Sequence, residues 1–134
     1  METTFNIPMA VNKLVSSAKS SSIHKCAMYV RQAMEAGGLS TIGRPDWACK
    51  YVDWLPNHGW ELIKTCITLN EKNDFTKNLA KPGDIAVYQK PGCGLTQPGH
   101  ICMFSGTQWI SDFKQNSMDV YSGKSTIHIF RYKS

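Results

Sequence analysis

The sequence predicts an α+β fold in which N-terminal helices pack on an antiparallel sheet of four to six strands. Helical periodicity dominates the first part of the chain, whereas the remainder consists of short runs of branched and aromatic residues separated by turn residues. The connections between these runs are too short for crossover helices, which favours antiparallel pairing. A chain of 134 residues can bury a core of its own, so we expect residues 1–134 to form a single domain.

Three helices are predicted before the strands. Apolar residues recur at helical spacing from Met9 to about Ala18 and indicate a first amphipathic helix. The serines at 20–22 are suitable N-caps for a second helix, which ends in EAGG with one of the two glycines as its C-cap. The segment WACKYVDWL predicts a third helix that stops at Pro56.

Five strands are predicted after Gly59, namely GWELI, DIAVYQ, HICMFSG, QWISDF and TIHIFRY. Only the tight turn SGT separates the third strand from the fourth, which indicates a hairpin. Pairing in which opposite residue numbers sum to about 212 makes His100 and Asp112 direct cross-strand partners.

Composition and charge exclude several classes of protein. The formal charge of +5 is spread along the chain without a dense basic block, which argues against a nucleic-acid reader. The longest apolar runs, such as IAVY and ICMF, are far shorter than the ~20 residues that a membrane-spanning helix needs. The N-terminus METTFNIPMAVNKLV has neither a basic n-region nor a continuous apolar region, so we expect synthesis in the cytoplasm without a signal peptide.

The chain has an odd number of cysteines, at positions 26, 49, 66, 93 and 102. At least one therefore stays outside any intramolecular disulfide, and Cys26 is the candidate. Pairs among the other four are an open alternative in an oxidising compartment. No C-x-x-C is present and the spacings match no zinc-binding pattern, so we expect no metal and no organic cofactor.

Cys26 is the candidate nucleophile. It lies about one turn inside the second helix if Ser22 is the cap, where the helix dipole and unpaired N–H groups favour the thiolate. The alternative is a buried core cysteine, because cysteine is also a small hydrophobic residue. Position alone does not decide between these two interpretations.

A cysteine nucleophile needs a base, and His100 is the best placed of the four histidines. It follows the turn GLTQPG and begins the strand HICMF, so the rigid edge of the sheet holds it accurately. His24 is expected on another side of the helix, His58 lies in a turn, and His128 has no acidic neighbour. Asp112 across the hairpin is predicted to orient the imidazole, with a solvent-facing strand end as the alternative.

These motifs in this order resemble the NlpC/P60 and CHAP peptidoglycan hydrolases, which are papain-like. The matching segments are HKCAMYVRQAMEAGG, KPGDIAVYQ and GHICMFSGTQWISDFKQ. The resemblance implies that Cys26 is the nucleophile, that His100 is the general base and acid, and that Asp112 orients His100, with Gln115 as the alternative third residue. It also implies amide hydrolysis in wall peptides. The serine-rich approach to Cys26 departs from the glycine-rich approach usual in that family.

The small chain most resembles the amidase effectors that type VI secretion delivers into the periplasm of rival bacteria, in particular the third effector family. That resemblance implies a peptidoglycan peptide substrate, with the bond between D-Ala and meso-diaminopimelate favoured, and a cognate immunity protein as partner. Neither a nucleic-acid nor a membrane partner is expected. Trp109 is a candidate substrate-binding residue in the groove. The alternatives are a phage CHAP-type endolysin and a non-catalytic module that binds the wall or a partner protein.

Overall fold

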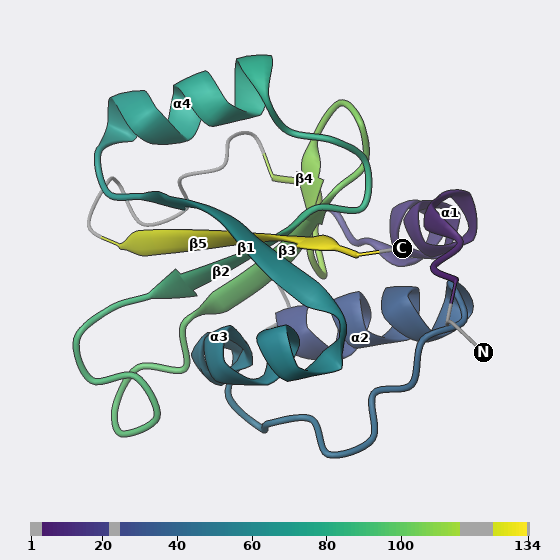
Figure 1. Ribbon diagram of the computed structural model, residues 1–134, viewed down its shortest axis with the longest axis horizontal. Coiled ribbons are helices and arrows are strands. Elements are labelled where there is room, and N and C mark those ends of the chain that lie inside the picture. Colours follow the sequence, from purple (N-terminus) through teal and green to yellow (C-terminus); the bar gives the residue numbers. More distant parts are fainter. Residues whose placement is uncertain (1–3, 22–24, 116–124, 134) are drawn as a thin grey trace.

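A five-stranded antiparallel sheet lies between two helical layers in the computed structural model, which describes residues 4–21, 25–115 and 125–133 (Figure 1). The strands are β1 (Trp60–Cys66), β2 (Ile85–Gln89), β3 (His100–Phe104), β4 (Trp109–Ile110) and β5 (Thr126–Tyr132), and their order is β1-β5-β2-β3-β4. The helices α2 (Cys26–Ala36) and α3 (Tyr51–Trp54) lie on one face of the sheet, and α1 (Ile7–Ser17) packs on α2. The predicted fold class and strand number are confirmed.

The first two helices form near the predicted positions. The side chain of Asn6 caps α1 by accepting a hydrogen bond from the N–H of Met9 at 3.0 Å. Helix α2 buries a stripe of apolar residues against the sheet, namely Val30, Ala33 and Met34. It begins at Cys26, so this residue opens the helix and does not lie one turn inside it. The predicted cap Ser22 lies outside the described residues.

The third predicted helix is broken into short turns. A 3-10 turn at Ala48–Lys50 leads into α3, and a second 3-10 turn at Leu55–His58 follows. Pro56 lies in the first turn of that second segment. Backbone N–H groups in a first turn have no acceptor within the helix, so the proline removes no hydrogen bond there. The helical segment therefore continues past Pro56 to Gly59, whose φ of 93° ends it.

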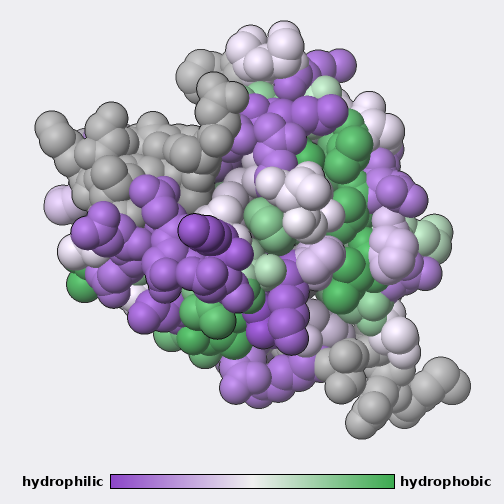
Figure 2. Space-filling view, turned by 90° about the horizontal axis from the view of Figure 1, so that it is seen from above, coloured by the Kyte–Doolittle hydropathy of each residue, from purple (hydrophilic) through white to green (hydrophobic). Residues whose placement is uncertain are grey.

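A fourth helix, α4 (Leu69–Asn78), connects β1 to β2 and covers the other face of the sheet. The expectation that strands alone follow Gly59 is wrong here. Thr68 and Glu71 form a reciprocal capping box that starts this helix. The outer surface of α4 is largely hydrophilic when seen from above (Figure 2). Because most of its residues are polar, the sequence lacks the apolar periodicity that usually reveals a helix.

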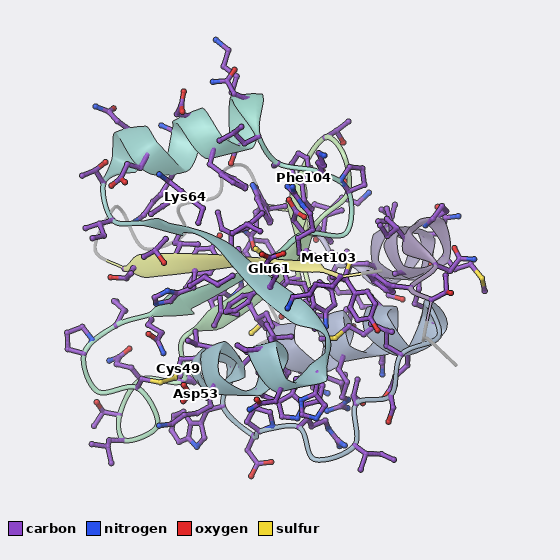
Figure 3. All side chains as sticks on the ribbon, in the orientation of Figure 1. Cys49, Asp53, Glu61, Lys64, Met103 and Phe104 are labelled. Atoms are coloured by element: carbon purple, nitrogen blue, oxygen red, sulfur yellow. A yellow bond between two sulfur atoms is a disulfide. The ribbon has the colours of Figure 1, made fainter. Side chains whose placement is uncertain are left out.

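An apolar cluster lies on each face of the sheet. Met103 and Phe104 are neighbours on β3, and their side chains point to opposite sides of the sheet (Figure 3). Met103 belongs to the larger cluster, under α1, α2 and α3, and Phe104 to the smaller one on the side of α4. Among the described residues, no helix combines the length and the hydropathy that crossing a bilayer requires.

Candidate active site

Cys26 is the first residue of α2, at the end where the backbone amides of a helix lack acceptors. The N–H of Tyr29 makes the first backbone bond of this helix, to the carbonyl of Lys25 at 3.1 Å. The amides of the first helical residues therefore have no acceptor within the helix, and they carry the positive end of its dipole. This arrangement favours negative charge on or next to the sulfur of Cys26.

Burial acts against that effect. Desolvation raises the pKa of the Cys26 thiol above its ordinary value, and the nearby carboxylate of Asp112 raises it further. Hydrogen bonding from the backbone N–H of Ile101, on the edge of β3, opposes both. The net direction is upward, so the resting side chain is a thiol that needs a base to become a nucleophile.

His100 begins β3 and supplies an imidazole that is only 8% exposed. Its Nε2 lies 2.8 Å from Oε1 of Gln115, and its ring meets the ring of Tyr88 edge-on at 5.1 Å between centroids. Burial lowers the pKa of His100, while the Gln115 hydrogen bond and the charge of Asp112 raise it. The net direction is downward, which keeps the ring neutral and able to accept a proton at neutral pH.

Gln115 determines which nitrogen of His100 is basic. The Nε2 of Gln115 donates to the hydroxyl of Tyr88 at 3.4 Å, so its Oε1 is the atom that faces the imidazole. An amide oxygen only accepts, hence Nε2 of His100 carries the proton and Nδ1 is the basic nitrogen. The backbone of Gln115 is held in turn by its N–H, which donates to the carbonyl of Trp109 at 2.9 Å.

The predicted cross-strand pairing of His100 with Asp112 is wrong. The observed register pairs Met103 with Ile110 and Phe104 with Trp109, and β4 is only two residues long. The ladder ends before Asp112 because the chain turns there, with the N–H of Ser111 donating to the carbonyl of Phe113 at 3.0 Å. The residue that the structure places on Nε2 of His100 is Gln115, the alternative third residue.

Asp112 is nevertheless fully buried beside the site. Its Oδ2 accepts a hydrogen bond from the N–H of Lys25 at 3.1 Å, and its Oδ1 accepts one from the hydroxyl of Ser111 at 3.1 Å. Its charge acts on both His100 and Cys26. Asp112 therefore attaches the start of α2 to the chain after β4 and places a negative charge next to the two candidate catalytic residues.

Cys26 and His100 line one cavity of about 560 Å³. The wall also includes the residues Lys25, Ala27, Met28, Arg31, Arg44, Pro45, Asp46, Ala48, Tyr51, Pro98, Gly99 and Phe113. In the ranges that the structure describes, no group of three or more histidine, cysteine or acidic side chains is arranged to hold a metal ion. The thiol of Cys26, the imidazole of His100 and the backbone amides at the start of α2 are the groups in this cavity that suit nucleophilic catalysis.

Trp109 does not line this cavity, which corrects the prediction that it binds substrate. It is 2% exposed, packs on Phe104 with centroids 4.9 Å apart, and donates from Nε1 to the hydroxyl of Thr76 at 2.9 Å. Both contacts belong to the apolar cluster beside α4, so Trp109 is a core residue.

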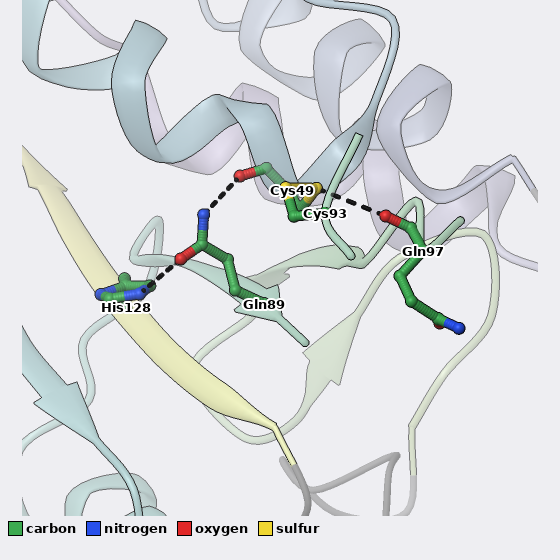
Figure 4. Close-up of a disulfide and its surroundings, with 5 residues drawn as sticks. All are labelled: Cys49, Gln89, Cys93, Gln97 and His128. Carbon is green, nitrogen blue, oxygen red and sulfur yellow. Dashed lines mark hydrogen bonds between the residues drawn. A yellow bond between two sulfur atoms is a disulfide. The ribbon is translucent and has the colours of Figure 1, made fainter. Parts of the chain in front are cut away.

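A disulfide between Cys49 and Cys93 holds the loop that leads into His100 (Figure 4). The N–H of Cys49 donates to the carbonyl of Pro98 at 2.8 Å, and Gln89 donates from its side chain to the carbonyl of Cys49 at 3.1 Å. Gly99 has a φ of 75°, and a Cβ there would lie 2.5 Å from the Cβ of Cys49. The loop before His100 thus packs closely on the segment that contains Cys49, and both segments contribute residues to the cavity wall, Pro98 and Gly99 from the loop and Ala48 from that segment.

The other described cysteines, Cys26, Cys66 and Cys102, are free thiols. Burial raises the pKa of Cys102 and Cys66, and both are fully buried in the apolar cluster beside α4. Of the three, only Cys26 lines the cavity described above. The sequence left open whether any of the four other cysteines form a disulfide, and the structure contains one such pair, Cys49 with Cys93.

No protein-family model matches the sequence, and no curated protein matches it. Among solved structures, the chain is similar to one in the native type VI effector-immunity complex Tae3-Tai3 from Ralstonia pickettii, with 29% identity and a TM-score of 0.70, covering 96% of this chain and 100% of that one. The selenomethionine form of that complex gives 28% identity and a TM-score of 0.65, with 90% and 97% covered.

A more distant match is the crystal structure of the effector Tae4 from Salmonella typhimurium in complex with the immunity protein Tai4 from Enterobacter cloacae. It has 10% identity and a TM-score of 0.59 over 96% of this chain and 97% of that one, which shows a shared fold. The structural neighbours are thus chains of type VI effector-immunity complexes, and none of these matches names the NlpC/P60 or CHAP families.

Proposed function

We propose that this protein is a cysteine-dependent peptidoglycan amidase that acts as an antibacterial type VI secretion effector. The observation that carries the proposal is the placement of Cys26 at the start of α2 and His100 at the start of β3 on one cavity, with Nε2 of His100 bound to Gln115 at 2.8 Å. The likeness of nearly the whole chain to a chain of the Tae3-Tai3 complex supports the effector role.

The mechanism is acyl transfer through a thioester. Nδ1 of His100 takes the thiol proton, and the sulfur of Cys26 attacks the carbonyl carbon of the scissile amide. The amides at the start of α2 stabilise the oxyanion of the tetrahedral intermediate. The resulting imidazolium protonates the leaving amine as the C–N bond breaks, and water activated by His100 then hydrolyses the thioester and restores the thiol.

Gln115 and Asp112 act on His100 in different ways in this mechanism. Gln115 fixes the tautomer through Nε2, as the third member of a catalytic triad does. Asp112 contributes its buried charge, which favours the imidazolium that forms during attack. We therefore assign the orienting role to Gln115 and an electrostatic role to Asp112.

The proposed substrate rests on the family resemblance of the sequence, and the proposed partner rests on the likeness to the solved structures. We assign the wall peptide as substrate, with the bond between D-Ala and meso-diaminopimelate as the favoured site of cleavage, and the target-cell periplasm as the place of action. A cognate immunity protein would protect the producing cell, since the matched structures are effector-immunity complexes. The formal charge of +5 suits an acidic inhibitor through electrostatic steering.

The test is digestion of purified Gram-negative peptidoglycan, followed by separation of the muropeptides and identification by mass. We expect wild type to remove cross-linked dimers and Cys26→Ala to leave them intact, and the new termini identify the bond. Cys66→Ala is the matched control because it removes a free thiol that is fully buried in the other apolar cluster and does not line the cavity. Equal digestion by wild type and Cys26→Ala would refute the cysteine mechanism.

A further inference from the structure

Two arginines line the cavity that contains Cys26, and neither is paired with an acidic side chain of the described residues. Arg31 comes from α2 and is half-buried, and Arg44 comes from the loop after that helix and is exposed. Within residues 4–21, 25–115 and 125–133, neither guanidinium has a hydrogen bond or an ion pair, unlike Arg131, which is paired with Asp84 at 2.7 Å. Their positive charges are therefore available to a ligand.

The wall as a whole is cationic. It carries the ammonium of Lys25 and the two guanidinium groups, against the carboxylate of Asp46 on the wall and the carboxylate of Asp112 buried beside it. A concave site lined mainly by one sign of charge concentrates ligands of the opposite sign. Because a guanidinium offers a planar fork of donors that matches a carboxylate, the pair of arginines favours this anion over a spherical one.

Tyr51 provides a second, independent observation in the same cavity. Its side chain is fully buried and lines the wall, yet its hydroxyl has no hydrogen-bond partner among the described residues. Burial raises the pKa of Tyr51, so the hydroxyl keeps its proton, while the positive charges of Arg31 and Arg44 act on this hydroxyl in the opposite direction. Such an unsatisfied buried donor is uncommon in folded proteins and indicates a ligand acceptor.

The spacing along α2 sets where a bound anion would lie relative to the attacked bond. Arg31 follows Cys26 by five residues, which corresponds to roughly 7.5 Å along the helix axis. An extended peptide advances about 3.3 Å per residue, so this axial rise corresponds to about two residues of a peptide that runs along α2 from the carbonyl attacked by Cys26. Ala27 and Met28, between these two positions, form the apolar part of the wall.

We propose that Arg31 and Arg44, with the hydroxyl of Tyr51, form a carboxylate-binding subsite that selects peptides with a free carboxylate one or two residues from the scissile amide. The subsite rests on the proposed function and specifies its substrate as an acidic peptide. It acts on specificity by positioning the peptide, and it takes no part in the proton transfers between Cys26 and His100.

The test uses two synthetic peptides that share one scissile amide and differ only in a free carboxylate or a carboxamide at the predicted distance. We expect wild type to prefer the acid by about 10-fold to 100-fold in kcat/KM, mainly through KM. Arg31→Gln and Arg44→Gln should each reduce this preference by about tenfold, Arg31→Lys should retain part of it, and Tyr51→Phe should reduce it less.

Lys13→Gln is the matched control, because it removes one exposed positive charge from α1, outside the cavity. It should leave the preference unchanged. Equal cleavage of both peptides by wild type, or an undiminished preference in both Arg31→Gln and Arg44→Gln, would overturn the subsite while leaving the proposed amidase intact.

Binding to Cys26→Ala by calorimetry separates the subsite from catalysis. The subsite is supported if Cys26→Ala binds the acid peptide more tightly than the amide and if the double variant Cys26→Ala with Arg31→Gln loses this preference. This result supports the subsite even if neither peptide is cleaved. Failure of wild type to cleave any wall peptide refutes the proposed amidase instead. Equal binding of the acid and the amide overturns the subsite.

Discussion

The side of the sheet next to α2 and the side covered by α4 both contain free cysteines, but they place them in different surroundings. Cys26 lies at a helix start, on a cavity that also exposes His100. Cys102 is only two residues from His100 on β3, yet it is sealed in the apolar cluster beside α4, where burial strongly favours the thiol. The comparison teaches that closeness to a histidine along the chain does not make a cysteine a candidate nucleophile, and that access to a cavity shared with a base distinguishes Cys26 from Cys102.

The largest expected effect on activity comes from replacing His100, and replacing His128, the other histidine with a lowered pKa, should have little effect. His100→Asn should reduce kcat/KM for wall peptides on the order of 10³-fold, because general acid and base catalysis are both removed. His128→Asn is the control, since His128 is held on the sheet by Thr65 and Gln89 at 3.2 Å and 3.1 Å and does not line the cavity. Similar losses in both variants would contradict the assignment of His100.

A second pair of variants distinguishes the two residues that support His100. Gln115→Leu should lower kcat by about 10-fold to 100-fold, because the tautomer of His100 is no longer fixed. Asp112→Asn should move the acidic limb of the pH profile of kcat/KM to lower pH, because the charge of Asp112 raises the pKa of His100. An acidic limb that moves to higher pH in Asp112→Asn would refute this electrostatic role.

The disulfide should affect stability more than chemistry. Replacing both Cys49 and Cys93 by alanine should lower the free energy of unfolding by about 2–4 kcal/mol, since the cross-link restricts the unfolded chain. Loosening the loop before His100 should also reduce kcat, but less than Gln115→Leu does. Chemical denaturation of the double variant, with Cys66→Ala as a control that leaves the disulfide in place, measures the first effect.

The smallest expected effect is a pH dependence of stability. Burial lowers the pKa of His100 and of His128 in the folded protein, so the unfolded chain binds more protons as pH falls below about 6.5. Their contribution to stability is present above the unfolded pKa and is lost as pH falls through the lowered folded values. His100→Asn should flatten this acidic loss in denaturant titrations at pH 7 and pH 5, and an unchanged slope would contradict it.

Local sequence patterns predicted most of the fold. Helical periodicity located α1 and α2, and branched, aromatic runs located the four longer strands. Helix α4 was missed because its sequence, LNEKNDFTKN, is mostly polar, although the capping box of Thr68 and Glu71 was a readable signal. Polar helices of this kind depend on their caps and on a few buried contacts such as Phe75.

The candidate site was predictable only in part. Local sequence identified His100 as the start of a strand and placed Cys26 near a helix start to within about one turn. The contact between Gln115 and His100 depends on a turn after β4 that ends the ladder early, and no local pattern specifies that turn. Arg31, Arg44 and Tyr51 resemble ordinary helix and loop residues in the sequence, so only the folded cavity brings them together.

Titration of Cys26 with a thiol alkylating reagent in the native protein tests the central claim most directly. Peptide mapping would follow the label at Cys26, Cys66 and Cys102 while hydrolysis of wall peptides is measured on the same samples. The account predicts that one label per molecule, at Cys26, abolishes hydrolysis in proportion to its extent while the two buried thiols remain unlabelled. Full labelling of Cys26 with undiminished hydrolysis would contradict it.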